Sequence, residues 1–284
     1  NLFFYILLLT LVILMNIGIF YFSATGITEL IANHIASILK REEHSVTQKN
    51  IITPDSRKSE FNFLEFDAYF FGFPVFGGRA PSVAEEWIRT LDGKNQKCSM
   101  FFTYGARDLE WAHQATFYLL TKANFKVVLS AEFIGRHSFN VSERFSIAEG
   151  RPNKGDLEIA TNFAKESISR FQKDSKFNID ISDFTYIPRE IEESEGLLAF
   201  AYPSREEGYC SMCYLCEEEC PVNAFNPIIG KTNRKLCIKC MHCVTICPDR
   251  VIHIGDITEI YKYFIDELGL TADVVQRKMS KIIY

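Results

Sequence analysis

The stretch NIGIFYFSATGIT, residues 16–28, decides the fold of this sequence. Its first half, residues 16–22, is apolar and β-rich, so we predict a buried strand there. Its second half gathers hydroxyl groups and a glycine just before an amphipathic stretch at residues 26–41, which predicts a loop leading into a helix. A strand, such a loop and a helix in this order are typical of a parallel α/β sheet.

The alternation of short apolar runs with amphipathic helical stretches continues along the chain. A parallel sheet with helices on both faces produces this pattern. Five strands in about 160 residues suit strand order 2-1-3-4-5, in which the first strand is central and a ligand binds at the carboxyl ends of the strands. We predict strands at 16–22, 47–53, 66–73, 98–104 and 126–133, and helices at 26–41, 81–92, 109–122 and 156–174.

The first 14 residues form an almost wholly apolar stretch that runs into the first predicted strand. A membrane span needs about 20 residues, so it would have to consume residues 17–22, which the sheet requires. The stretch also lacks the basic segment and cleavage-site pattern of a signal peptide. We expect residues 1–14 to be an upstream extension or a fragment edge, with the fold beginning at Met15 and no membrane association; a genuine anchor or signal peptide is the alternative.

Eight of the nine cysteines fall in two copies of the pattern C-x2-C-x2-C-x3-C-P. Bacterial ferredoxins hold 4Fe-4S clusters with this run, and in two-cluster ferredoxins the fourth cysteine of each run crosses to the other cluster. Pro221 and Pro248 would turn the chain away after each crossing ligand. The expected ligand sets are Cys210, Cys213, Cys216 and Cys247 for one cluster, and Cys237, Cys240, Cys243 and Cys220 for the other.

Two other uses of these cysteines compete with clusters. Zinc accepts four thiolates but usually takes them as two separated pairs rather than as a triplet plus one. A disulfide framework fits a large chain with tight cysteine triplets less well. Cluster thiolates need a reducing compartment, which indicates the cytoplasm. The ninth cysteine, Cys98, opens an apolar strand and is expected to be a small buried hydrophobe.

Composition narrows the classes of partner. The net charge of −5 and the absence of a concentrated basic stretch argue against nucleic acid. Hydrophobic residues make up 47% of the chain, enough for a packed core outside the cysteine-rich region. Glutamates surround the first cysteine run and form either an acidic docking face for a basic redox partner or a solvated face. These glutamates are Glu206, Glu207, Glu217, Glu218 and Glu219.

The loop after the first strand carries hydroxyls and backbone N–H groups at a helix N-terminus, an arrangement that suits a phosphate. Plain helix capping is the alternative. This loop resembles the flavodoxin family, whose fingerprint places hydroxyl residues, Thr-Gly and a final Thr around the FMN phosphate. The resemblance implies FMN contacts from the loop, and two further strand-end segments would flank the flavin ring. The residues are Ser23, Ala24, Thr25, Gly26, Ile27 and Thr28 in the loop, and Pro74, Val75, Phe76, Gly77, Thr103, Tyr104 and Gly105 at the ring.

One residue departs from the family. Ile27 stands where flavodoxins usually have Asn, which weakens the expected contacts to phosphate or ring. The aromatic side chains of Phe73 and Phe76 could stack on a flavin or serve as core packing.

From Met15 onward the chain resembles fused proteins with a flavodoxin domain followed by a bacterial 2(4Fe-4S) ferredoxin domain of α+β class. We expect a flavodoxin-like domain at 15–175, a linker at 176–205 with a short strand at 197–202, a ferredoxin domain at 206–255 and a helical tail at 256–284. The resemblance implies electron transfer between two 4Fe-4S clusters and FMN, with redox proteins as partners. The chain would be a carrier or an FMN-dependent oxidoreductase. The alternative is a ferredoxin with a flavin-free docking domain.

Two more residues carry expectations. His242 lies between cysteines of the second run and either tunes a cluster or is a surface loop histidine. Asp156, after Arg151 and Asn153, is expected to stabilise the first turn of the last helix of the sheet domain through the helix dipole. No Ser-His-Asp or paired-carboxylate constellation emerges from the sequence.

Overall fold

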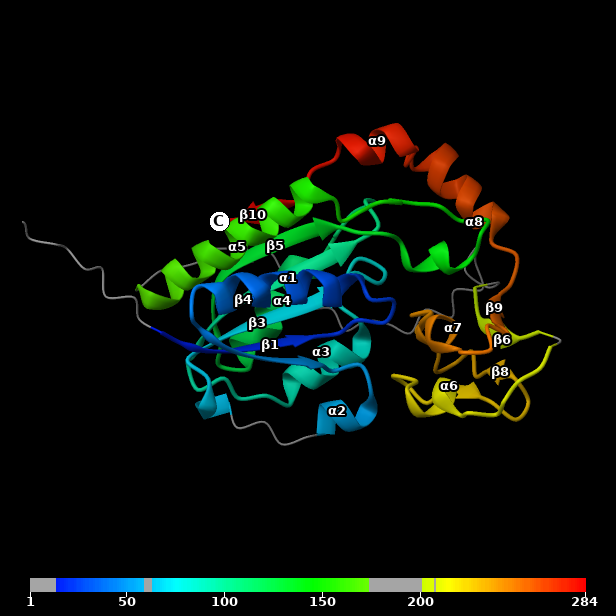
Figure 1. Ribbon diagram of the computed structural model, residues 1–284, viewed down its shortest axis with the longest axis horizontal. Coiled ribbons are helices and arrows are strands. Elements are labelled where there is room, and N and C mark those ends of the chain that lie inside the picture. The colour runs from blue at the N-terminus through cyan, green and yellow to red at the C-terminus, as the bar shows by residue number, and fades with distance from the viewer. Residues whose placement is uncertain (1–13, 59–62, 174–200, 207) are drawn as a thin grey trace, which may run out of the picture.

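The computed structural model describes residues 14–58, 63–173, 201–206 and 208–284. Its main element is a six-stranded sheet of order β10-β5-β4-β3-β1-β2 (Figure 1). Strands β1 to β5 run parallel, and their order 2-1-3-4-5 is that of flavodoxin-like sheets, so the predicted fold of this domain is confirmed. The strands are β1 Asn16–Tyr21, β2 Ser45–Asn50, β3 Ala68–Pro74, β4 Lys97–Tyr104, β5 Lys126–Ile134 and β10 Lys281–Ile283.

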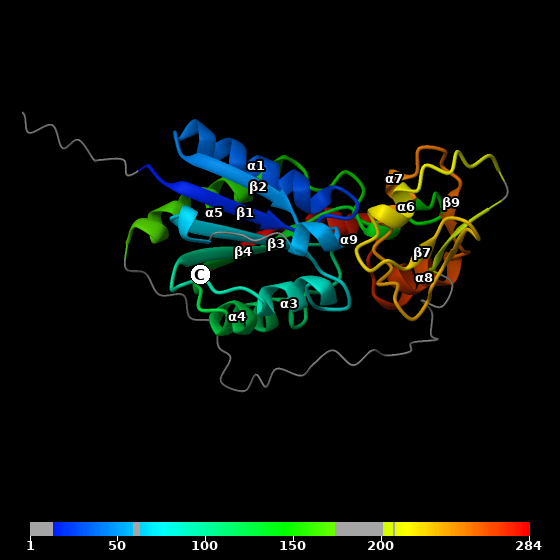
Figure 2. The ribbon, with the colours of Figure 1, turned by 90° about the horizontal axis from the view of Figure 1, so that it is seen from below.

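Helices cover both faces of the sheet (Figure 2). Helices α1 (Ile27–Arg41) and α5 (Lys154–Gln172) lie on one face, and α3 (Ser82–Arg89) and α4 (Ala112–Lys122) lie on the other. Each face buries its own apolar cluster, as expected for parallel strands buried on both sides. Gly72 in β3 is required by this packing, because a Cβ there would meet the ring of Phe101 in β4 at 2.1 Å.

The predicted ends of some elements shift. The helix predicted at 109–122 begins only at Ala112, because Glu110 has a φ of +44° that no α-helix accepts. Three short elements were not predicted: α2 (Pro54–Lys58), η1 (Phe63–Glu65) and η2 (Ser138–Val141).

The cysteine-rich segment folds into a small second sheet of order β7-β8-β6-β9. Its central strand β6, Pro203–Arg205, lies in the segment that we assigned to the linker. The strand predicted at 197–202 and most of that linker lie outside the described residues, as do residues 1–13. The other elements are α6 (Leu215–Glu218), β7 (Phe225–Asn226), β8 (Lys231–Thr232), α7 (His242–Ile246) and β9 (Ile252–Ile254). We call residues 201–206 and 208–255 the cysteine module.

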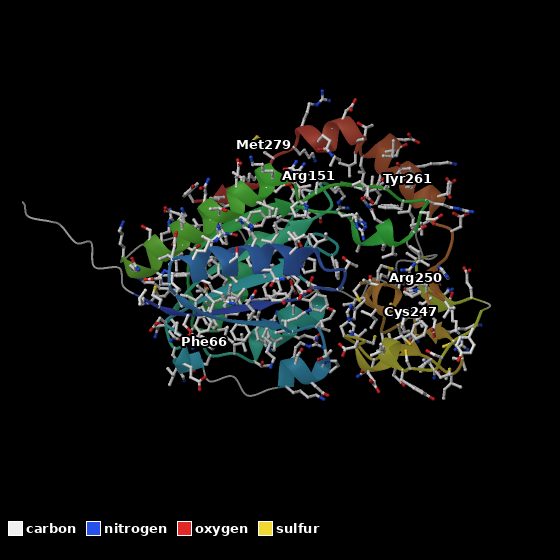
Figure 3. All side chains as sticks on the ribbon, in the orientation of Figure 1. Phe66, Arg151, Cys247, Arg250, Tyr261 and Met279 are labelled. Atoms are coloured by element: carbon white, nitrogen blue, oxygen red, sulfur yellow. The ribbon has the colours of Figure 1, made fainter. Side chains whose placement is uncertain are left out.

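The tail after the cysteine module returns to the large sheet. It forms α8 (Thr258–Lys262), the π-helix η4 (Tyr263–Glu267) and α9 (Ala272–Arg277), as the helical spacing predicted. It then adds an unpredicted strand, β10, antiparallel to β5. The helical part packs into an apolar cluster with residues of the large domain, including Phe139 and Phe145. Figure 3 shows Tyr261 on this tail and Met279 close to Arg151 at the large domain.

A buried ion pair fastens the tail. Asp156 accepts hydrogen bonds at 2.5 Å from Nε and Nη2 of Arg151 and from the hydroxyl of Ser280. The Arg151 and Asp156 side chains are only 2% exposed. Asp156 also completes a capping box with Asn153 at the start of α5. The predicted role of Asp156 in the first helical turn is therefore one part of a larger role in holding the tail.

Candidate functional site

The hydroxyl loop, residues 23–28, connects β1 to α1 at the carboxyl end of the sheet. Asn50 holds it through both the N–H and the carbonyl of Ser23, each at 3.1 Å. The Ser23 hydroxyl accepts from the N–H of Glu29 at 3.1 Å and so satisfies one N–H group of the first turn of α1, whose N-cap residue is Gly26. Gly26 has a φ of +89° and no atom within 4 Å of a Cβ built on it, so open space lies beside the start of α1, where helix N–H groups can bind an anion.

The three loops predicted to hold FMN come together. The hydroxyl of Thr28 lies 2.7 Å from that of Thr103, and the N–H of Val75 donates to the Thr103 carbonyl at 2.9 Å. The rings of Phe22 and Phe76 meet edge to face with centroids 6.3 Å apart. Phe22 and Phe73 are fully buried, whereas Val75, Phe76 and Tyr104 are partly exposed, so the core explanation holds for Phe73 and the strand-end residues remain available to a ligand.

A polar network that the sequence did not reveal supports Tyr104. His113 Nδ1 lies 2.8 Å from the Ser130 hydroxyl, and its Nε2 lies 3.3 Å from Glu132, which accepts from the Tyr104 hydroxyl at 3.4 Å. Burial and the Glu132 charge raise the pKa of Tyr104, so it stays a neutral donor. Ser130 is fully buried, so no substrate reaches this Ser-His-Glu set and it positions the Tyr104 side chain.

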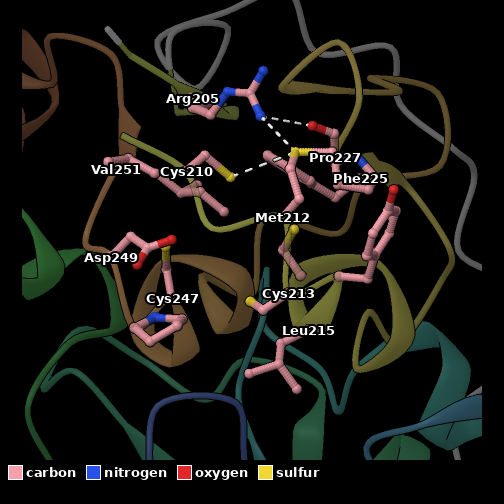
Figure 4. A pocket seen from close by; sticks show the side chains of 14 residues that line it. Arg205, Cys210, Met212, Cys213, Leu215, Phe225, Pro227, Cys247, Asp249 and Val251 are labelled. Carbon is pink, nitrogen blue, oxygen red and sulfur yellow. Dashed lines mark hydrogen bonds between the residues drawn. The ribbon is translucent and has the colours of Figure 1, made fainter. Parts of the chain in front are cut away.

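Two pockets in the cysteine module each collect four cysteines. We call them the outer pocket, shown in Figure 4, with about 370 Å³ of space that includes open solvent, and the inner pocket, with about 300 Å³ on the same measure. Each pocket joins three cysteines of one run to the fourth cysteine of the other, which is the expected crossed grouping. The outer pocket is lined by Cys210, Cys213, Cys216 and Cys247, and the inner pocket by Cys220, Cys237, Cys240 and Cys243.

The chemistry of these thiols is that of unbonded cysteines in a mostly apolar setting. All nine cysteines are free of disulfides, and Cys98 is fully buried in β4, as predicted. Burial raises the pKa of Cys216 and Cys237 to about 11 and that of Cys240 to about 12. Backbone N–H groups point at some of the sulfurs: Ala224 donates to Cys220 at 3.2 Å and Lys239 to Cys237 at 3.4 Å.

In the described part of the chain, no three His, Cys, Asp or Glu side chains are arranged to hold one metal ion.

Two hydrogen bonds join the inner pocket to the large domain. His242, between Cys240 and Cys243, has its Nδ1 2.8 Å from the carbonyl oxygen of Ala24 in the hydroxyl loop. His242 is therefore an interdomain residue, and the surface-loop interpretation is wrong. Arg57 of α2 donates to the carbonyl of Pro221 at 2.5 Å while also binding the carbonyls of Ile51 and Ile52 at 2.9 and 2.5 Å.

The glutamates near the first cysteine run are exposed at Glu206, Glu217 and Glu218 and partly exposed at Glu219, whereas Glu207 lies outside the described residues. None of the described helices is long and apolar enough to cross a membrane.

Comparisons with known proteins found similar solved structures, three of which are described below. No protein-family model matches the chain, and no curated protein matches it. A flavodoxin from the domain Archaea is 12% identical, with 56% of this chain and 100% of that chain covered and a TM-score of 0.41. Flavodoxin 2 from Bacillus cereus is 22% identical, with 55% and 98% covered and a TM-score of 0.41. Rubredoxin oxygen:oxidoreductase from Desulfovibrio gigas is 17% identical, with 55% and 36% covered and a TM-score of 0.40. The fold assignment itself rests on the strand order.

Proposed function

We propose that this chain is an electron-transfer protein that holds two 4Fe-4S clusters in the cysteine module and FMN at the hydroxyl loop. The clusters would carry single electrons, and FMN would exchange one or two. The chain thereby connects a one-electron donor to a two-electron acceptor, with other redox proteins as its partners and the reducing cytoplasm as its setting.

The observation that carries this proposal is the crossed grouping of the cysteines. Cys247 lines the outer pocket and Cys220 lines the inner pocket, although each belongs to the other run in the sequence. Two-cluster ferredoxins exchange their fourth ligands in this way, whereas two independent zinc sites have no need to. The N–H groups directed at Cys220 and Cys237 would stabilise thiolate charge in a loaded cluster and raise its potential.

The hydroxyl loop fits a phosphate on two grounds. Open space at Gly26 lies beside the N-terminus of the 15-residue helix α1, where backbone N–H groups can bind an anion, and the partly exposed Thr25 adds a hydroxyl group there. Gly77 in the second loop is also exposed, with a φ of +58° and open space at its Cβ position, so a flat ring can approach that backbone closely.

Cofactor analysis of the anaerobically purified chain tests the proposal. We expect about eight irons and eight labile sulfides per chain, as eight cysteine ligands imply, together with one FMN. Zinc without labile sulfide would overturn the whole assignment.

A second candidate function follows from the apolar side chain of Ile27. Its side chain fills the space beside Gly135, where a Cβ would meet Ile27 Cγ2 at 2.3 Å, so a hydrocarbon group stands where flavodoxins present an amide. A chain with eight irons and no flavin would be a ferredoxin whose large domain serves for docking. An FMN-dependent oxidoreductase remains compatible with the first candidate, and a substrate-dependent oxidation of the bound flavin would identify it.

A further inference from the structure

The geometry points to a fixed order of the two cysteine sites: the inner pocket faces the hydroxyl loop, and the outer pocket is the entry point for electrons from a partner. This inference rests on the proposed function and specifies its route. Electrons would pass from the partner to the Cys210, Cys213, Cys216 and Cys247 site, then to the Cys220, Cys237, Cys240 and Cys243 site, and then to the flavin.

The contacts between the large domain and the cysteine module lie at the inner pocket. The His242 bond to Ala24 starts between two inner cysteines, and the Arg57 bond ends on Pro221, the residue after the inner ligand Cys220. Cys240 itself belongs to the apolar cluster of the large domain, with Phe22 and Ala24 among its members. Two hydrogen bonds and the apolar packing of Cys240, Ile238 and Met241 therefore connect the large domain to the inner site.

The cysteines of the outer pocket are more exposed than those of the inner pocket, which favours the outer pocket as the docking site of the partner. Cys213 is exposed, and the other three outer cysteines are partly exposed. In the inner pocket, Cys220 is 8% and Cys240 is 7% exposed, whereas Cys237 and Cys243 are partly exposed. The side chains around the outer pocket are open as well, with Tyr209 at 81% and Tyr214 at 39% exposed. The outer site is therefore the more exposed of the two, and a carrier protein can approach it more closely than the inner one.

The two pockets adjoin through their helices. Helix α6 packs against α7, and these helices carry Cys216 of the outer pocket and Cys243 of the inner pocket. Phe225 lines both pockets. An electron that reaches the outer site therefore has the inner site as its neighbour.

The electrons and protons of this route balance. Each encounter with a reduced one-electron carrier protein oxidises that carrier and delivers one electron to the outer site. Two encounters supply two electrons, and with two protons from water they reduce one FMN to its dihydro form.

Spin labels on the cluster-loaded full chain test the order without requiring flavin. A nitroxide is attached at Thr25→Cys, beside the inner pocket, or at Ile228→Cys as the matched control. Ile228 is 68% exposed and follows Pro227, which lines the outer pocket. Reduced clusters are paramagnetic and speed the relaxation of a nearby label. In the fully loaded chain the native cysteines do not compete for the label, because eight would bind the clusters and Cys98 is fully buried. A ligand variant frees the three other cysteines of its site, so each is compared with the same variant lacking the introduced cysteine.

Two ligand variants assign each label to a cluster. We expect Cys240→Ser to abolish the faster relaxation at position 25 and Cys213→Ser to leave it, with the reverse at position 228. If either variant loses all its iron, partial iron removal by EDTA replaces it: the first four irons lost should come from the outer site and affect only the label at 228. If loss of the outer cluster abolished the faster relaxation of the label at position 25, the proposed order of the two sites would be wrong.

The experiment distinguishes failure of the proposed order of the two sites from failure of the proposed function. A chain without iron and sulfide fails the function before any label is read. A chain with eight irons but no flavin rejects the relay and still reports which site faces the hydroxyl loop.

Discussion

Nδ1 of His242 lies 2.8 Å from the carbonyl oxygen of Ala24, across 218 residues of sequence. A carbonyl oxygen only accepts, so Nδ1 carries the proton. Burial lowers the pKa of His242, so the ring is neutral and its Nε2 is an acceptor. This Nε2 is buried and has no hydrogen-bond partner among the described residues. One neutral imidazole thus connects the cysteine module to the loop predicted to hold phosphate.

Replacing this histidine should loosen the contact between the domains. His242→Leu leaves the Ala24 carbonyl without its donor, at a cost of about 1–3 kcal/mol for a buried polar group. We expect amide hydrogen exchange in residues 23–28 to accelerate about tenfold or more. His253→Leu is the matched control, because His253 is exposed on β9. Unchanged exchange in the His242 variant would show that other contacts hold the domains together.

The Arg151–Asp156 pair should dominate the anchoring of the tail. Asp156→Ala leaves a buried guanidinium unpaired, and we expect a loss of about 3–5 kcal/mol in the free energy of unfolding. Ser280→Ala removes one hydrogen bond to the same carboxylate and should cost about 1–2 kcal/mol. Urea denaturation measures both.

Glu158→Ala serves as the control on the same helix, since the side chain of Glu158 is 67% exposed and 4.0 Å from Lys154. Its effect should stay within about 0.5 kcal/mol. If the Asp156 variant were as stable as this control, the Arg151–Asp156 ion pair would not be what anchors the tail.

His137 should make the folded state sensitive to acid. Burial, with a smaller contribution from the Arg107 charge, lowers the pKa of His137 from 6.5 to about 4. Its stabilising contribution is therefore complete above pH 6.5 and disappears as the pH falls through 4. We expect this contribution to be about 2 kcal/mol, less than the full pKa shift implies because the ring keeps some contact with water.

The variant His137→Asn isolates this effect, because Asn keeps an acceptor for the N–H of Phe139, which His137 Nδ1 now accepts at 3.1 Å. Denaturation curves at pH 7, 5.5 and 4.5 should show a smaller acid loss in the variant than in the original chain. Parallel losses would mean that other groups govern acid stability.

Ile27→Asn should strengthen flavin binding. An amide at this position supplies the polar contact that flavodoxins have, and one added hydrogen bond of about 1 kcal/mol corresponds to about fivefold in affinity. Titration of the flavin-free protein with FMN, followed by fluorescence quenching, measures the change. Equal affinity in both chains would mean that the backbone groups at Gly26 carry the phosphate without help from this side chain.

The large fold was predictable because its signals are local. Each parallel strand is a short apolar run, each helix has one apolar face, and alternation of the two leaves few topologies. The crossed grouping of the cysteines joins distant segments, and it could be predicted only because the spacing matches that of two-cluster ferredoxins, which exchange their fourth ligands.

The missed features all depend on which distant segments touch. Strand β10 has only three residues, and its pairing with β5 appears only when the tail is in place. His113 and Ser130 form no motif, since one lies on a helix and the other on a strand. The His242 contact exists only because the cysteine module lies against Ala24, and no local pattern predicts a docking geometry.

The position of β10 in the chain also sets an order of assembly. Strand β5 receives its antiparallel partner only from residues 281–283, which follow all eight pocket cysteines in the sequence. In a chain synthesised from its N-terminus, β5 is therefore an open sheet edge until residues 281–283 have been made. Open edges recruit other chains, so we expect β10 to protect the large sheet from aggregation by covering this edge.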